Sequence, residues 1–77
     1  MVYKKFGKVF KLIREQRNLS LASFTDLGIS KSSLSRFERG ESMMNFEDVV
    51  YSLHSMGISL ENFENILKII ERENVVK

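Results

Sequence analysis

The sequence predicts an all-α fold, a compact bundle of five helices, and three observations support this prediction. Apolar residues recur every three or four positions along successive segments, as on the buried face of an amphipathic helix. The chain contains no proline, so its helices run uninterrupted and end at glycines and polar caps. Its 77 residues fit one domain, spanning 1–77, whose small core must be compact and rich in helix.

The first two helices are expected before Gly28. The first one ends near Asn18, and its buried stripe consists of Phe6, Val9, Phe10 and Ile13. Ser20 is the expected N-cap of a short second helix, whose apolar side chains are Leu21, Phe24 and Leu27. Gly28 is free to adopt the positive φ angle that a sharp exit from this helix requires.

Three further helices follow, and a polar residue introduces each of them. Ser30 caps the third helix, which ends at Gly40 and buries Leu34 and Phe37. Asn45 caps the fourth helix, which ends at Gly57 and whose inward stripe is Phe46, Val49, Val50 and Leu53. The fifth helix covers residues 59–73, and its apolar residues are Leu60, Phe63, Ile66, Leu67, Ile69 and Ile70.

Charge is distributed unevenly between the two halves of the chain. Residues 1–40 hold nine Lys or Arg against three Asp or Glu, a net charge of +6, whereas residues 41–77 carry a net charge of −4. Cations gathered on one surface gain free energy by displacing counterions from phosphates, so the first half is the expected contact for a polyanion. Charge alone fits equally well with a helix face that is solvated and binds nothing. The sequence motif of the third helix decides between a polyanion contact and a solvated face.

The third helix has an outward face of hydroxyls and cations. With Leu34 and Phe37 buried, the residues that face outward near its N-terminus are Lys31, Ser32, Ser35 and Arg36. Arg and Lys can bind guanine O6 and N7 in a major groove, and Ser can bind almost any base edge. The alternative is that the serines only cap and solvate the helix. Serine competes with the backbone for hydrogen bonds. The four serines at positions 30, 32, 33 and 35 are therefore a poor choice for helix stability alone.

The second and third helices, at about residues 20–39, are joined by a short turn that contains Gly, which is the pattern of a helix-turn-helix. The stretch "LIREQRNLSLASFTDLGISKSSLSRFERGES" resembles the DNA-binding domain of phage-repressor-type (XRE-type) regulators, and "SMMNFEDVVYSLHSMGISLENFENIL" resembles the helices that complete it. Within that family, "SKSSLSRFERGES" is most similar to Rgg/MutR-type transcriptional regulators. The resemblance implies a lambda-repressor-like fold.

The resemblance also implies a function and roles for particular residues. The expected function is sequence-specific binding of double-stranded DNA by a transcriptional regulator, with the recognition helix, residues 31–38, in the major groove. Base contacts are expected from Lys31, Ser32, Ser35 and Arg36. Backbone contacts are expected from Ser33, Arg39 and Asn45. Arg14 and Glu38 match an internal ion pair that joins the first helix to the end of the third.

Two departures from the family pattern alter the expected backbone contacts. Leu21 occupies the position where relatives commonly carry a phosphate-binding Gln, and the segment from Ser20 to Gly28 is one residue shorter than usual. After Gly40, where relatives often place basic residues, the chain has Glu41, Met43 and Met44. Backbone binding is therefore expected to shift to Arg17, Lys8 or Arg39, and the monomer to bind DNA only modestly.

The last helix has more apolar residues than a five-helix core obviously needs. Its surplus fits a homodimer surface, a face for a C-terminal peptide-sensing domain of the Rgg type, or simply the seal of this domain's own core. We expect the chain to be the N-terminal part of a longer regulator, and a stand-alone small repressor is the alternative.

Other chemistry is weakly indicated. His54 is the single histidine, without a second ligand nearby, so we expect no metal site, no cofactor and no enzymatic activity. Cysteine is absent and the apolar runs are short, so we expect a cytoplasmic protein without a membrane partner. The rival to DNA binding is a protein-interaction module of the same fold, of the antitoxin or anti-repressor type.

Overall fold

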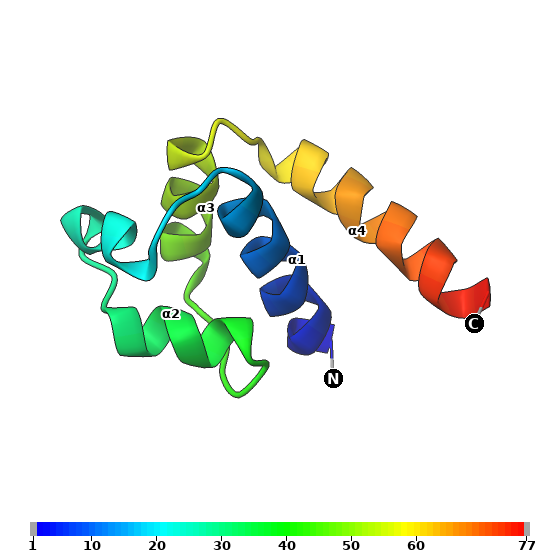
Figure 1. The fold of residues 1–77 in the computed structure, drawn as a ribbon, viewed down its shortest axis with the longest axis horizontal. Coiled ribbons are helices and arrows are strands. Elements are labelled where there is room, and N and C mark those ends of the chain that lie inside the picture. The colour runs from blue at the N-terminus through cyan, green and yellow to red at the C-terminus, as the bar shows by residue number, and fades with distance from the viewer. Residues whose placement is uncertain (1, 77) are drawn as a thin grey trace.

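The computed structural model describes the backbone of residues 2–76 and the side chains of residues 5–70. Within this part of the chain there are five helices and no strand: α1 (Val2–Gln16), the 3₁₀ helix η1 (Leu21–Leu27), α2 (Lys31–Glu38), α3 (Phe46–Ser55) and α4 (Leu60–Val76). The predicted all-α fold is confirmed. In Figure 1, α1 runs through the middle of the molecule, with α2 and α3 to one side and α4 to the other.

Phe10 lies at the centre of the core. Its ring contacts that of Phe24 from η1 at a centroid distance of 5.7 Å and that of Phe37 from α2 at 5.5 Å. Each of these three side chains is at most 1% exposed, and burying one contributes roughly 1.5–3 kcal/mol. The aromatic contacts therefore hold α1, η1 and α2 together, as the predicted buried positions in the first three helices require.

Gly7 allows α1 and α2 to approach each other closely. A Cβ atom built at Gly7 would lie 1.9 Å from the carbonyl oxygen of Phe37 and 2.8 Å from its carbonyl carbon. Both neighbours are backbone atoms, which cannot rotate away as a side chain can. The packing of α1 on the C-terminal end of α2 consequently requires glycine at this position.

Helix α2 ends in a left-handed turn at Gly40, where φ is 77°. The Gly40 N–H donates to the Phe37 carbonyl at 3.0 Å, and the Glu41 N–H donates to the Arg36 carbonyl at 2.8 Å. These two bonds form a Schellman motif. Asn18 ends α1 by the same pattern and is the single non-glycine residue with positive φ in the described chain, at 57°. The predicted ends near Asn18 and Gly40 are confirmed.

The first helix of the helix-turn-helix is a 3₁₀ helix rather than an α-helix. A 3₁₀ helix rises about 2.0 Å per residue and an α-helix about 1.5 Å, so seven residues of the first span as much as roughly nine of the second. A segment one residue shorter can in this geometry extend as far as a longer α-helix would. Ser20 lies at the N-cap position, but its hydroxyl contacts the Ser23 hydroxyl at 3.3 Å instead of capping a backbone N–H.

Two apolar residues expected in the core are exposed, namely Leu27 and Phe46. Phe46 is the first residue of α3, directly after the Asn45 cap, and 71% of it is accessible to solvent. Met44, the residue before the Asn45 cap, is buried. A helix that begins at the surface turns its first residue outward, whereas the residue before the cap packs back toward the helix.

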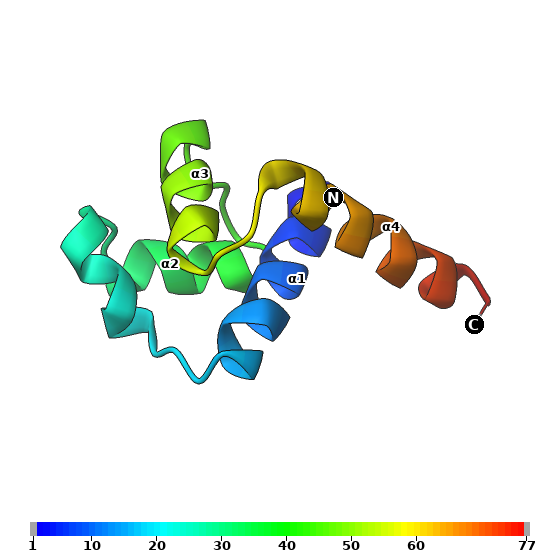
Figure 2. The ribbon, with the colours of Figure 1, turned by 90° about the horizontal axis from the view of Figure 1, so that it is seen from above.

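The last helix is longer than expected, because α4 continues to Val76 instead of ending near residue 73. Figures 1 and 2 both show its C-terminal half projecting away from the other helices. In the described part of the chain, α4 packs against α1 and α3 but not against α2. No described helix combines the length and the apolar character needed to cross a bilayer.

Candidate DNA-binding surface

The local sequence of α2 fixes which of its faces is exposed. The Ser30 hydroxyl accepts a hydrogen bond from the Ser33 N–H at 3.1 Å, which caps the helix. Leu34 and Phe37 are at most 1% exposed and hold the opposite face against the core. The site residues of α2 are then accessible to different degrees: Lys31, Ser32 and Arg36 are exposed, and Ser33 and Ser35 are half-buried.

The helical spacing places these side chains in two rows. Lys31 and Ser35 are four residues apart, as are Ser32 and Arg36, so each row pairs a cation with a hydroxyl. Serine is short enough to let the helix backbone approach a ligand surface, while Lys and Arg extend further. The arrangement can donate several hydrogen bonds to the acceptors that base edges and phosphates present.

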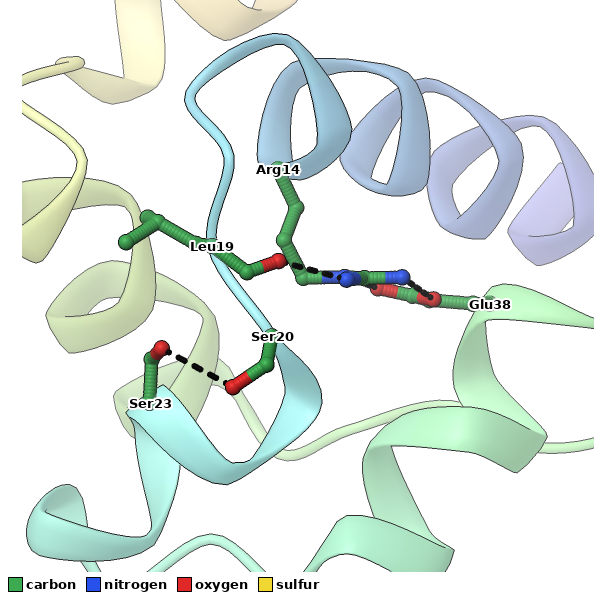
Figure 3. Close-up of polar contacts among 5 residues, drawn as sticks. All are labelled: Arg14, Leu19, Ser20, Ser23 and Glu38. Carbon is green, nitrogen blue, oxygen red and sulfur yellow. Dashed lines mark hydrogen bonds and ion pairs between the residues drawn. The ribbon is translucent and has the colours of Figure 1, made fainter.

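Arg14 of α1 connects its own helix to the C-terminal end of α2 and to the turn before η1 (Figure 3). Its Nε donates to Glu38 Oε2 at 2.7 Å, and its Nη2 donates to Glu38 Oε1 at 3.0 Å, which makes a bidentate pair. Its Nη1 donates to the carbonyl of Leu19 at 2.7 Å, just before η1. One side chain of α1 therefore fixes the C-terminal end of α2 and the entry to η1 together.

This ion pair is protected from water, since the side chains of Arg14 and Glu38 are only 10% and 4% exposed. The pKa of the Arg14 guanidinium is raised above its ordinary value, first by the hydrogen bond with Glu38 and also by the charges of Glu38 and Glu15, although burial lowers it. Arg14 therefore carries its charge at any physiological pH. Its role in this arrangement is to position α2.

Two cations expected to contact a DNA backbone have partners within the protein. Arg17 Nε donates to the carbonyl of Met56 at 2.8 Å, which ties Arg17 to the C-terminal end of α3. Arg39 forms an ion pair with Glu41, from Nε to Oε2 at 2.9 Å, and both side chains are more than half exposed, at 57% and 54%. A phosphate must therefore compete with Glu41 for the guanidinium of Arg39.

Acceptor groups of the protein itself already lie at the N-terminus of α3, beside the backbone N–H groups of its first turn. The Asn45 Oδ1 accepts a hydrogen bond from the Asp48 N–H at 2.8 Å. Glu47 and Asp48 place two carboxylates in the first turn, where they complement the positive end of the helix dipole. These charges oppose the binding of a phosphate to the backbone N–H groups at this end.

A polar cleft of about 400 Å³ separates the start of α2 from the start of α3. Arg36 and Ser33 line it from α2, and Ser42, Asn45 and Asp48 line it from the other side. Sequence reasoning did not select Ser42 or Asp48, because their proximity to Arg36 depends on how the 40–45 turn folds back. The cleft adds hydrogen-bonding groups beside the exposed face of α2.

Helix η1, the turn at Gly28 and helix α2 form a helix-turn-helix, with the second helix exposed along one face and buried along the other. A sequence model described as Helix-turn-helix matches residues 10–50, which is more than half of the chain. The chain therefore belongs to the XRE-type helix-turn-helix family, a family of DNA-binding regulator domains. No solved structure gives a significant match to it.

Two further observations concern His54 and metal binding in the described part of the chain. His54 is exposed, and no group of three or more His, Cys, Asp or Glu residues in the described chain is placed to hold a metal ion. The family to which the chain belongs is one of DNA-binding domains and is not an enzyme family.

Proposed function

We propose that this chain binds double-stranded DNA sequence-specifically as a transcriptional regulator, with α2 in the major groove. The observation that carries the proposal is the exposed face of α2, on which Lys31, Ser32 and Arg36 project from a helix fixed in the core. Arg14 and Glu38 strengthen this support because their buried pair orients the helix. Membership of a DNA-binding family agrees with the same function.

The proposal divides the site into two sets of contacts. We infer that Lys31, Ser32, Ser35 and Arg36 contact bases or the adjacent phosphates. Lys31, Ser32 and Arg36 are exposed on α2, and Ser35 lies one helical turn after Lys31. We infer that Ser33, Arg17, Arg39 and Asn45 contact the backbone. The internal partners of the last three weaken these backbone contacts, so an isolated copy should bind arbitrary DNA within about 10⁻⁴ to 10⁻⁶ M.

The salt dependence of binding to an arbitrary duplex tests the proposed function against its rival. For DNA binding, the logarithm of the association constant should fall linearly against the logarithm of salt concentration, by about 0.9 for each phosphate contacted. A protein-interaction module of the antitoxin or anti-repressor type should show no binding to the duplex. Fluorescence anisotropy with a labelled duplex gives the slope directly.

Arg36→Ala is expected to weaken binding to a selected DNA site by about 1–3 kcal/mol and to relax its sequence preference. The guanidinium is the longest donor on the exposed face of α2 and suits guanine O6 and N7. The affinities of both proteins for the selected site and for a scrambled duplex measure this effect. Lys11→Ala on α1 removes an exposed charge of the same sign and is the matched control. An equal loss on both duplexes would assign Arg36 to phosphate instead.

Glu41→Gln is expected to strengthen binding to any duplex by about two- to fivefold at low salt. The substitution releases Arg39 from its carboxylate partner, and the salt slope should become steeper by about one phosphate contact. Glu61→Gln, at the start of α4, changes the net charge equally and is the control. If both variants change affinity equally, the effect belongs to net charge and not to the Arg39–Glu41 pair.

We also propose the finer assignments that the sequence suggests. These are an Rgg/MutR-type regulator, a cytoplasmic location, binding as a homodimer through the last helix, and a further C-terminal domain that senses a peptide. Dimers of helix-turn-helix proteins bind two half-sites about 34 Å apart. The motif "SKSSLSRFERGES" supports the subtype, and the surface of α4 supports a partner.

A further inference from the structure

The guanidinium of Arg36 has no partner within the described part of the protein. The structure describes the side chains of four arginines, and three of them donate hydrogen bonds within the chain, namely Arg14, Arg17 and Arg39. The fourth, Arg36, is exposed and forms no hydrogen bond or ion pair with a described residue. A bidentate bond to guanine uses two of its five N–H donors, which leaves the others for a second acceptor.

A carboxylate without a partner lines the same polar cleft as Arg36. Among the residues around this cleft, Arg36 is the single cation and Asp48 is the single anion. Asp48 is half-buried and lies on α3, across the cleft from the wall that α2 forms. In the described chain its carboxylate forms no hydrogen bond and no ion pair. The cleft therefore holds two opposite charges that are not yet paired.

The cap of α3 does not use this carboxylate. In a capping box, the side chain three residues after the N-cap accepts a hydrogen bond from the N–H of the capping residue. Here only the other half of the exchange is formed, because the Asp48 N–H donates to Asn45 Oδ1 at 2.8 Å. The helix is capped through the Asp48 backbone, so the Asp48 side chain is free to accept a hydrogen bond from a group in the cleft.

We propose that Asp48 is a positioning residue that makes Arg36 selective for a base over a phosphate. This inference rests on the proposed function, because it takes α2 to lie in the major groove. When Arg36 binds guanine, Asp48 accepts a hydrogen bond from one of the remaining donors and holds the guanidinium in one orientation. Its negative charge also disfavours the competing arrangement, in which Arg36 binds a phosphate. The carboxylate thus lowers affinity for arbitrary DNA and increases discrimination.

Glu47 provides a comparison within the same helical turn. Glu47 and Asp48 both lie in the first turn of α3, where each adds one negative charge near the positive end of the helix dipole. Glu47 is exposed and is not among the residues that line the cleft. Its charge therefore affects any DNA duplex alike, whereas the charge of Asp48 also acts on Arg36.

The test measures the binding of Asp48→Asn and Glu47→Gln by fluorescence anisotropy. The two probes are a duplex enriched by selection from random DNA and a scrambled duplex. Asp48→Asn should bind the scrambled duplex about two- to fivefold more tightly and leave the affinity for the enriched duplex nearly unchanged, so the ratio of the two affinities falls. Glu47→Gln should strengthen both equally and keep the ratio. Both variants should melt at similar temperatures, since each loses one charge from the same turn.

A second measurement places Asp48→Asn in the Arg36→Ala protein. Without the guanidinium there is nothing for Asp48 to position, so the ratio should not fall further, and the two substitutions should not be additive. The inference is overturned, while the proposed function stands, if Asp48→Asn keeps the ratio of the unchanged chain or lowers it equally without Arg36. Both are overturned if the unchanged chain enriches no duplex or binds the enriched and scrambled duplexes equally.

Discussion

Arg14→Ala is expected to lower the free energy of unfolding by about 3–5 kcal/mol, the loss typical of breaking a buried ion pair. The substitution leaves the Glu38 carboxylate buried without its bidentate partner, and it removes the donor to the Leu19 carbonyl. Because about 4–8 °C of melting temperature corresponds to each kcal/mol in a domain of this size, thermal denaturation followed by circular dichroism measures the effect readily.

Two control variants separate the geometry of the pair from its charge. Arg14→Lys should recover little stability, because an ammonium cannot form two parallel bonds to Glu38 and also reach Leu19. Arg39→Ala removes an exposed ion pair and should cost at most about 1 kcal/mol. An Arg14→Ala protein that melts at the unchanged temperature would show that the Arg14–Glu38 pair does not stabilise the fold.

Gly7→Ala is expected to destabilise the protein by about 1–3 kcal/mol, and the sign of the effect is the informative part. Alanine is the better helix former by roughly 1 kcal/mol, so an unhindered site in α1 would become more stable on substitution. Here the added methyl group would meet the backbone of Phe37, and α1 must move away from α2 to accept it.

Denaturant unfolding of Gly7→Ala and of Lys8→Ala, its exposed neighbour, provides the comparison. Lys8→Ala should change stability by no more than about 0.5 kcal/mol. A Gly7→Ala protein as stable as the unchanged chain, or more so, would mean that α1 and α2 do not approach as closely as described. Both Gly7 and Arg14 act on the same end of α2, so either variant should also disturb the orientation of the recognition helix.

Sequence periodicity predicted the helices and most of the core, because the residues on the buried face of a helix recur every three or four positions and are apolar. Phe10, Leu34 and Phe37 follow that spacing and are buried. Ser30 and Asn45 were predicted as caps because capping is local chemistry, and both accept the expected hydrogen bonds.

Features that depend on tertiary packing were not predictable in the same way. Gly7 reads in the sequence only as a poor helix former, and its importance arises from Phe37, thirty positions away. Phe46 fits the apolar spacing of α3 but lies where the helix begins at the surface. The sequence indicated a short second helix, whereas its 3₁₀ geometry was not predicted.

The candidate site was predictable in composition and only in part in its internal pairing. The exposed positions on α2 follow from the burial of Leu34 and Phe37, which periodicity supplies. The Arg14–Glu38 contact was expected from family resemblance, and α1 brings the two residues together. The contact of Arg17 with Met56 and that of Arg39 with Glu41 could not be anticipated. The partner of an exposed cation depends on the folded geometry, which the sequence pattern does not show.

The most direct test of the central claim, that α2 reads DNA sequence, is a binding selection from random duplex DNA at two salt concentrations. It should be run in parallel on this chain and on Arg36→Ala. We expect the unchanged chain to enrich a defined motif that persists at the higher salt and that becomes less defined with the variant. Enrichment of no motif, with DNA retention lost at moderate salt, would contradict the claim, and so would an unaltered motif with Arg36→Ala.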